Sequence, residues 1–440
     1  MTFLKRVVVI GSGMAGARIA QQLDPRFDLT VVGEEPHVPY NRVLLAEVLG
    51  GRYGPEVVAL PTRAAVRWMH GVRAVRVDRA ERRVVCDEGS ELPYDALVLA
   101  TGSAPVLPPL RGLFEPGAKE LPEGVRAFRT MDDCLALRGE VRPGSSAVVV
   151  GGGLLGVSAA RALACRGARV VLAHQGERLM ERQLDAGAAA LLERHLERRG
   201  VEVHTKCRVR GLHAEPHGRS GTRTVRSVEL SDGYRLDAES VVLTCGVRPR
   251  VGLARAAGLE VARGVVVDDR LRTSDPHVYA VGDCAEHRGV LYGLAGPAQD
   301  QADTAARVIG AALSGARDRG DSGLPEYRGT RAPTRLTLGA PPGVVRQGPA
   351  AGPDGSAQRP LDLAAFGEPE PGEDDDVVHL TDATRGIYRK AVVRDDRLVG
   401  AVLLGDLSAV GTLTRTWEDG GALPAASLLH LLTPLPTEAH

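Results

Sequence analysis

Two glycine-rich segments, each directly behind a short run of valines, mark the places where this chain could hold phosphorylated ligands. The first follows residues 6–10 and reads GSGMAG, and the second follows residues 147–150 and reads GGGLLG. In such a fingerprint the first glycine allows a tight turn from strand to helix, the second lets backbone N–H groups approach a pyrophosphate, and the third lets helix and strand pack closely. The amino end of the next helix adds a positive field. The segments therefore predict two dinucleotide sites, and their glycines are Gly11, Gly13 and Gly16, then Gly151, Gly153 and Gly156.

An acidic side chain at the end of the second strand is also expected to take part in the first site. Residues 28–32 read as that strand, and Glu34 and Glu35 follow it, about 20 residues beyond the glycines. A carboxylate at this point can accept hydrogen bonds from the hydroxyl groups of an adenosine ribose. We take Glu34 as the first choice and Glu35 as the second.

Length and composition bound the class of protein. A chain of 440 residues is longer than one domain with a single hydrophobic core usually is, so two or three domains are expected. Its 55 basic and 55 acidic residues cancel, which leaves no field to gather nucleic acid or an acidic membrane, and neither is an expected partner. The first residues run directly into a strand, with no room for a signal peptide, and no apolar stretch is long enough to cross a membrane. We therefore expect a cytoplasmic protein.

Cysteine and acid spacing argue against several redox and metal centres. No two of the six cysteines stand at C-x-x-C spacing, which argues against a redox-active dithiol, an iron–sulfur cluster and a zinc site. The acidic run at 374–376 lies among prolines and glycines and is expected to be solvated, so no metal ligand is predicted. We expect three histidines to lie on the surface or in loops rather than to act as a general base: His174, His277 and His287.

Alternating strand and helix patterns supply the elements that position these residues. Around the first fingerprint we expect a helix to about 23, strands at 28–32, 95–99 and 278–281, and a helix that begins near 297. Around the second we expect an entry helix at 132–137, a helix to 164, a strand at 168–172, a helix at 185–199, and strands near 201–203, 224–230 and 240–246. Strands that alternate with helices predict parallel sheets, so the expected fold class is α/β with two Rossmann-like domains.

From about Ser314 the composition changes. Residues 340–376 are dense in glycine, proline and acids and are expected to be loop or disordered. Beyond them, residues 386–393 and 398–404 read as the two strands of a hairpin. Two short helices then complete a small α+β domain.

Both fingerprints, the ATG loop at 100–102 and the VGDC segment at 281–284 together resemble the pyridine nucleotide-disulfide reductase superfamily of the glutathione-reductase type. Within it, the chain is most similar to the flavin-containing N-terminal part of the NAD(P)H-nitrite reductase large subunit. The matching stretches are EEPHVPYNRVLL, FRTMDDC, RLMERQLD and RTSDPHVYAVGDCAEHRG. The resemblance implies a split FAD domain at 1–113 and 247–325, an NAD(P) domain at 114–246, and a C-terminal interface domain at 326–440.

For the first site, the resemblance implies FAD as the ligand. Glu34, with Glu35 as the alternative, would bind its ribose. Arg42 would pair with its phosphate oxygens, which suit the planar guanidinium. The other residues implied at FAD are Gly11, Gly13, Met14, Ala15, Gly16, Ala100, Thr101, Gly102, Gly282 and Asp283.

For the second site, the resemblance implies the nicotinamide cofactor. An NAD-specific site carries an acid at the end of the strand near Leu172, but the chain reads AHQG there, and His174 is the cofactor-binding candidate at this point. Without the acid, discrimination against a 2′-phosphate is weak and Arg178 could accept it, so NADH and NADPH both stay open. The other residues implied at this site are Gly151, Gly153, Leu154, Leu155, Gly156 and Gly246.

Two departures from the superfamily lie near the expected place of hydride transfer. A glutamate commonly follows the second fingerprint in the form GxxGxE, and here that residue is Ser158. Related ferredoxin reductases pair the glutamate with a lysine five residues after the arginine equivalent to Arg42, and here that residue is Glu47. Two facing carboxylates would repel, so we infer that Ser158 is tolerated because Glu47 is acidic. We take Ser158 and Glu47 as the catalytic candidates, with the hypothesis that hydride transfer is slowed or regulated.

The resemblance implies an FAD-dependent NAD(P)H oxidoreductase that passes electrons to a separate acceptor. The active-site cysteines of disulfide reductases are absent, since the chain reads NRVLL after Tyr40. The chain stops where nitrite reductases continue into iron–sulfur and siroheme regions, so we do not expect it to reduce nitrite alone. The expected acceptor is a ferredoxin, a rubredoxin, a siroheme subunit or a small molecule, and a homodimer is kept open. The alternatives are a biosynthetic flavoenzyme with a dedicated small substrate and a redox-sensing module with blunted turnover.

Overall fold

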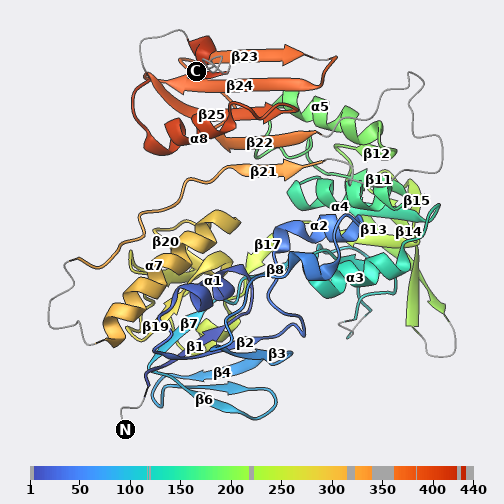
Figure 1. Ribbon diagram of the computed structural model, residues 1–440. Coiled ribbons are helices and arrows are strands. Elements are labelled where there is room, and N and C mark those ends of the chain that lie inside the picture. Colours follow the sequence, from blue (N-terminus) through green and yellow to red (C-terminus); the bar gives the residue numbers. More distant parts are fainter. Residues whose placement is uncertain are drawn as a thin grey trace. The chain divides into compact units, whose positions relative to one another are not determined.

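The computed structural model describes residues 4–115, 117, 120–217, 222–314, 323–338, 361–382, 384–423 and 428–432. The chain forms two compact units, each of which is described by itself (Figure 1). Unit 1 comprises residues 1–45, 54–106 and 247–332, and unit 2 comprises residues 46–53, 107–246 and 333–440. The division into three domains given above, with its boundaries, stays a prediction.

A parallel five-stranded sheet in the order β19-β7-β1-β2-β3 forms the core of unit 1. Its strands are β1 (Arg6–Ile10), β2 (Asp28–Gly33), β3 (Arg67–His70), β7 (Ala96–Leu99) and β19 (Val278–Ala280). The central strand β1 is apolar on both faces, and Val7, Val8 and Val9 are at most 2% exposed, as is typical of a covered parallel sheet. Helices α1 (Met14–Gln22) and α7 (Ala295–Leu313) pack against each other beside the sheet (Figure 1). The strands and helices predicted for this region are confirmed.

Short elements that the sequence patterns did not predict complete unit 1. An antiparallel sheet joins β4 (Ala74–Asp78), β5 (Arg83–Cys86) and β6 (Glu91–Pro93). Two further pairs are β8 (Ser103–Pro105) with β17 (Val247–Pro249), and β18 (Val265–Val267) with β20 (Ala285–His287). The remaining helical segments are η1 (Arg42–Leu44), η2 (Pro55–Val58), α6 (Gly252–Ala256) and η3 (Gly282–Cys284), and α2 (Leu45–Leu49) begins where the chain passes into unit 2.

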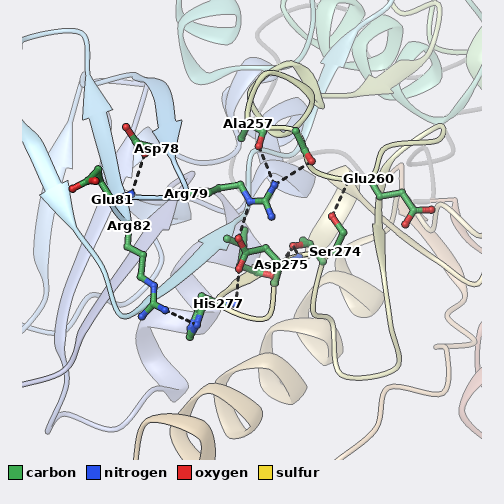
Figure 2. A network of polar contacts seen from close by, with 12 residues as sticks. Asp78, Arg79, Glu81, Arg82, Ala257, Glu260, Ser274, Asp275 and His277 are labelled. Carbon is green, nitrogen blue, oxygen red and sulfur yellow. Dashed lines mark hydrogen bonds and ion pairs between the residues drawn. The ribbon is translucent and has the colours of Figure 1, made fainter.

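Arg79, in the turn between β4 and β5, fastens the small sheet to the segment that leads into β19 (Figure 2). Its Nε donates to Asp275 at 2.7 Å, and its Nη1 donates to the carbonyl oxygens of Ala257 and Gly258 at 3.3 and 3.2 Å. The other carboxylate oxygen of Asp275 accepts from the backbone N–H of His277 at 2.9 Å. Charge-assisted bonds of this kind are the stronger class of hydrogen bond. The network therefore fixes the start of β19, the strand that delivers the Gly-Asp turn of the first site.

The first sheet of unit 2 repeats the plan of the sheet in unit 1. Its parallel order is β12-β11-β10-β16-β9, with the strand before the second fingerprint, β10, in the centre. Its strands are β9 (Val125–Ala127), β10 (Ser146–Val150), β11 (Arg169–Ala173), β12 (Val201–His204) and β16 (Ser240–Leu243). Its helices are α3 (Met131–Glu140), α4 (Leu154–Cys165) and α5 (Ala186–Glu197), and β13 (Val209–His217), β14 (Thr222–Leu230) and β15 (Arg235–Asp237) form an antiparallel sheet beside it. The predicted α/β class is confirmed.

The C-terminal part of unit 2 is a five-stranded sheet in the order β21-β22-β25-β24-β23. Its elements are β21 (Thr334–Thr337), β22 (Asp362–Gly367), β23 (Asp376–Asp382), β24 (Ile387–Arg394), β25 (Arg397–Leu404), α8 (Val410–Asp419) and a 3-10 turn at Leu428–Leu431. The predicted hairpin is confirmed as β24 and β25, which Asp395 and Asp396 join with φ angles of 49° and 55°. Two successive left-handed residues form the type I′ turn whose twist suits a hairpin.

The prediction of loop across 340–376 is wrong for part of that range. Residues 362–367 form β22, which lies between β21 and β25, and Leu363 to Phe366 are at most 5% exposed. This short apolar run is hidden by the prolines, glycines and acids around it. The expectation of a solvated acidic run is wrong for Asp375, whose side chain is 3% exposed and bonds to Arg394 and to the N–H of Gly372. Residues 340–360 lie outside the described residues.

Two features are absent from the described ranges. None of the helices there is both long and apolar enough to span a membrane. No three His, Cys, Asp or Glu side chains in those ranges are arranged to hold a metal ion.

Asp185 ties the C-terminal sheet to α5 inside unit 2. Its Oδ1 accepts from the N–H of Ala188 at 3.0 Å and caps the amino end of α5. Its Oδ2 accepts from the Tyr388 hydroxyl and from Lys390 Nζ, each at 2.6 Å, and the Asp185 and Lys390 side chains are 7% and 9% exposed. Burial on its own would raise the pKa of the Asp185 carboxyl, but the hydrogen bonds from Lys390, Tyr388 and Ala188 outweigh burial and lower that pKa.

We expect Asp185→Asn to destabilise the protein by about 3 kcal/mol at neutral pH, because the change leaves Lys390 buried without its counter-ion. The difference from the wild type should be present in full above about pH 4, the usual pKa of an unfolded aspartate. It should shrink as the pH falls through the lower pKa of the folded state. Urea unfolding of both proteins over this pH range measures the difference, and a constant difference would contradict a role for the charged carboxylate.

Candidate functional site

The first fingerprint is built around two backbone contacts that only glycine permits. Gly11 lies in the left-handed region at φ +114°, and a Cβ on it would stand 2.1 Å from the carbonyl oxygen of Ala100. A Cβ on Gly16 would stand 1.9 Å from the carbonyl oxygen of Gly11. The end of β1 and the start of α1 therefore meet backbone to backbone, which agrees with the roles expected of the first and third glycines.

Gly13 leaves the amino end of α1 open. It is the N-cap residue of this helix and makes no side-chain capping bond. Apart from its chain neighbours and the backbone of its own helix, only Arg42 Nε of the described atoms comes within 4 Å of the place where a Cβ on Gly13 would be, at 3.8 Å. The first N–H groups of α1, from Met14 and Ala15 onward, are thus uncapped, and such groups attract phosphate. We call this open end of the helix, with Gly13 as its N-cap, the glycine cradle. It fits the pyrophosphate of a dinucleotide.

Arg42 is held beside the cradle by Glu35 and Tyr40. Its Nη2 donates to Glu35 Oε1, and the Tyr40 hydroxyl donates to Glu35 Oε2 at 2.6 Å. The guanidinium carbon also lies 5.1 Å from the centroid of the Tyr40 ring. Burial on its own would lower the pKa of Arg42, but Tyr40 and the acids nearby outweigh burial and raise that pKa. Glu35, the second choice for the ribose, is thus engaged in holding Arg42, which favours Glu34 for that role.

Glu34 is half-exposed and forms an ion pair with Arg250. Arg250 follows β17, and the pairing of β17 with β8 brings it beside the loop at 100–102. Its N–H donates to the carbonyl oxygen of Gly102 at 2.9 Å, and its own carbonyl oxygen accepts from the Thr101 hydroxyl at 2.8 Å. Arg250 therefore joins the predicted ribose acid to the predicted FAD loop, and the sequence around it carries no signal for this contact.

The Gly282–Asp283 turn lies against the same helix. A Cβ on Gly282, which is at φ +78°, would stand 3.1 Å from the Cβ of Ala15. The carboxylate of Asp283 accepts from the Ser103 hydroxyl at 2.7 Å. The structure therefore brings together, inside unit 1, the glycine cradle, Arg42, the loop at 100–102 and this turn.

The second fingerprint repeats the first one's geometry inside unit 2. A Cβ on Gly151, at φ +113°, would stand 2.6 Å from the carbonyl oxygen of Thr244, and one on Gly156 would stand 1.7 Å from that of Gly151. Gly153 is the N-cap of α4, again without a side-chain cap, and apart from its own chain neighbours and helix backbone no described atom lies within 4 Å of its Cβ position. The other residues predicted here begin α4 or follow β16: Leu154, Leu155 and Gly246.

His174 turns into the second glycine loop. Its Nδ1 accepts from the N–H of Gly152 at 3.1 Å, so its proton is on Nε2 and the ring is neutral. Burial lowers the pKa of His174, and the charge of Glu181 offsets part of this effect. Arg178 is paired with Glu370 at 2.6 Å. The Nε2 of His174 makes no hydrogen bond to the described residues, so the role of His174 at the cofactor stays a prediction, and the choice between NADH and NADPH stays open.

The two catalytic candidates have separate partners on α4. The Ser158 hydroxyl donates to the carbonyl oxygen of Leu154 at 2.7 Å, four residues back on the helix. Glu47 pairs with Arg161, and these side chains are 10% and 2% exposed. Arg161 stands one turn beyond Ser158 on the same helix face. Glu47 therefore reaches α4, but its charge is matched by Arg161, the one charged residue in the apolar stretch 147–164.

The expectation that His287 lies on the surface or in a loop is wrong. His287 is the last residue of β20 and is 1% exposed. Its Nε2 is 2.8 Å from Asp269 Oδ1, and its ring packs edge-on against Tyr327, with the centroids 5.0 Å apart. The pairing of β20 with β18 carries this histidine into the core, and such pairing has no local signal in the sequence.

Arg161→Met would leave the Glu47 carboxylate buried, with the more distant Arg52, at 3.7 Å, as its counter-charge. We expect the free energy of unfolding to fall by about 3 to 5 kcal/mol. The double variant Glu47→Gln with Arg161→Met removes both charges and should recover most of this loss. Urea unfolding midpoints of the single and double variants test the expectation, and equal instability of the two would show that the lost charge balance is not the cause.

Comparisons with known proteins agree with this geometry. The chain matches the family described as pyridine nucleotide-disulphide oxidoreductase over residues 5–305, and the rubredoxin NAD+ reductase C-terminal domain over residues 360–420. It is 32% identical to an NAD(P)H nitrite reductase of Bacillus subtilis (strain 168), over 99% of this chain and 50% of that protein. It is also 32% identical to the assimilatory nitrate reductase electron transfer subunit of the same organism, over 91% of this chain and 48% of that protein.

The chain thus spans about half the length of these two relatives. Among solved structures, the ferredoxin reductase for the CYP199A2 system from Rhodopseudomonas palustris is similar, with a TM-score of 0.76 and 25% sequence identity. That likeness covers 97% of this chain and 98% of the other. Because the first family match extends over more than half of the chain, the chain belongs to the pyridine nucleotide-disulphide oxidoreductase family.

Proposed function

We propose that the chain is an FAD-dependent NAD(P)H oxidoreductase whose electrons go to a separate acceptor. Its family uses FAD and NAD(P)H. The observation that carries the proposal is the pair of glycine cradles, at Gly13 and Gly153, each directly behind the central strand of its own parallel sheet. In such sheets, ligands bind beyond the carboxyl ends of the strands. Two cradles in one chain suit two dinucleotides that exchange electrons.

Unit 1 supplies the groups that would hold FAD. Arg42, beside Gly13, would pair with the pyrophosphate, and Asp283 would reach the ribityl chain or the pyrophosphate. Glu34 would accept from the ribose hydroxyls while Arg250 steadies its carboxylate. FAD held by these residues would supply the chemistry of a two-electron hydride acceptor that can release its electrons one at a time. Hydride transfer needs no general base. The role of these residues would therefore be to bind FAD and to orient it.

Unit 2 would hold the nicotinamide cofactor with fewer groups. Its cradle offers the backbone of Gly151, Gly153 and Gly156, and no described side chain stands over Gly153 as Arg42 stands over Gly13. At the end of β11 the neutral ring of His174 is bonded within the loop. A sparse site of this kind suits a cofactor that must leave after each reaction, whereas the richer first site suits a flavin that stays bound.

We propose a one-electron redox protein as the acceptor, of the ferredoxin, rubredoxin or siroheme type. One relative is named an electron transfer subunit, a similar solved structure is a ferredoxin reductase, and residues 360–420 match a domain of rubredoxin reductases. All six cysteines of this chain are free thiols, and the sequence spaces none of them as a C-x-x-C pair. The chain therefore offers no C-x-x-C dithiol that could receive the electrons.

Anaerobic titration of the FAD-loaded full-length protein with NADH and, separately, with NADPH tests the proposal. We expect at least one nucleotide to bleach the flavin absorbance, and we expect added ferredoxin or rubredoxin to restore it. A redox dye in place of the protein acceptor is the control for flavin reactivity. Bound FAD that neither nucleotide reduces would contradict the proposal and favour a redox-sensing module. Turnover confined to one small substrate would favour a biosynthetic flavoenzyme.

Ser158→Glu tests the hypothesis that the serine slows or regulates hydride transfer. The new carboxylate would restore the acid that the superfamily commonly carries here, one turn before Arg161. We expect anaerobic flavin reduction to become about tenfold faster, which corresponds to about 1.4 kcal/mol of activation free energy. Ser158→Gln, of similar size and without charge, is the matched control and should not accelerate the reaction. An unchanged rate with both NADH and NADPH would show that the hypothesis is wrong.

A further inference from the structure

Gln301 is a fully buried amide in the middle of a helix of small residues. Its side chain is 0% exposed, and most of the buried positions near it on α7 are alanines, including Ala298, Ala302 and Ala305. Burial of an amide is unfavourable unless hydrogen bonds replace those it made to water. An apolar side chain would fill this place at lower cost, so the amide must perform a task that an apolar side chain cannot.

That task is visible at Gly282. The backbone N–H of Gly282 donates to Gln301 Oε1 at 2.7 Å. Gly282 is in the left-handed region, at φ +78°, and a Cβ on it would stand 3.1 Å from the Cβ of Ala15 and 3.8 Å from the Cβ of Ala298. The turn after β19 is thus pressed between α1 and α7, and Gln301 satisfies its inward-facing N–H.

The next residue, Asp283, is held by a second bond. Its Oδ2 accepts from the Ser103 hydroxyl at 2.7 Å, and Ser103 directly follows the loop at 100–102. One bond therefore fixes the backbone of Gly282 and another fixes the carboxylate of Asp283. Together they determine where the side chain predicted to bind FAD points.

The surroundings of the amide nitrogen, Nε2, account for the orientation of the Gln301 side chain. The amide can accept from an N–H group only through its oxygen, so Nε2 faces the opposite way. Nε2 and the hydroxyl of Tyr327 are both buried there without a hydrogen bond of good geometry to the described residues. Burial raises the pKa of Tyr327 and keeps its hydroxyl protonated, and Gln301 is among the polar groups beside that hydroxyl. Because Nε2 faces the side of Tyr327, the amide oxygen of Gln301 stays directed at the N–H of Gly282.

We propose that Gln301 is a positioning residue of the FAD site, which holds the Gly282–Asp283 turn in the form that receives the cofactor. This inference rests on the FAD site proposed above. Gln301 acts through the backbone of Gly282. Without an acceptor at this position the turn is free to relax in the apoprotein, and binding of FAD must then re-form it. Affinity for FAD should therefore fall when the acceptor is removed.

Gln301→Met removes the acceptor at nearly constant volume. Full-length protein freed of FAD is titrated with FAD, and quenching of the flavin fluorescence gives the dissociation constant. We expect the constant to rise by at least about tenfold, because a buried N–H loses its partner. For Gln301→Glu, whose carboxyl oxygen can still accept from Gly282, we expect a change within about threefold. Arg307→Met, at an exposed position of the same helix, is the control and should bind FAD like the wild type.

Two results would overturn the inference while leaving the proposed function in place: normal FAD affinity in Gln301→Met, or affinity in Gln301→Glu as weak as in Gln301→Met. Circular dichroism of the apoproteins checks their fold. If the methionine variant does not fold, Gln301→Asn replaces it, because its amide is too short to reach Gly282 and the same loss is expected. Normal affinity in that variant would overturn the inference too. A wild-type protein that does not bind FAD would overturn the proposed function together with the inference.

Discussion

The backbone contact between the first and third glycines of each fingerprint is the constraint on which both sites depend. Gly16 packs against the carbonyl of Gly11, and Gly156 packs against the carbonyl of Gly151, so closely that a Cβ would overlap the oxygen. Any side chain there would push the helix away from the end of the central strand. Because the contact is kept, the uncapped N–H groups of the first helical turn face the edge where loops from neighbouring parallel strands arrive.

The two copies of this arrangement differ in what those loops contribute. In unit 1, three side chains from separate segments are each held by a second residue: Arg42 by Glu35, Glu34 by Arg250, and Asp283 by Ser103. In unit 2, the histidine at the corresponding strand end is bonded back into the glycine loop. Held side chains lose little freedom when a ligand binds, so the first site is the better prepared of the two for lasting occupation.

How much could be predicted from the sequence depends on the range of the interaction. The fingerprints, their strands and the hairpin at 387–404 have local signals, in valine runs, glycines and turn residues, and they were predictable. The partners of the site residues were not, because Arg250 is brought to Glu34 by the β8–β17 pairing and Gln301 to Gly282 by the packing of α7. Strand β22 was not predictable for a different reason, since its short apolar run stands between stretches rich in glycine, proline and acids, which are typical of loops.

A long-range pairing also surrounds the serine after the second fingerprint. Glu47 is buried on α4 and needs a cation there, which Arg161 provides one turn beyond Ser158. A buried ion pair adds little stability over apolar side chains of similar size, so we infer that this pair serves mainly to fix the position of α2 against α4. An acid at position 158 would lie one turn before Arg161 and would compete with Glu47 for this arginine. The serine bonds to the carbonyl oxygen of Leu154 instead and so leaves the ion pair of Arg161 with Glu47 undisturbed.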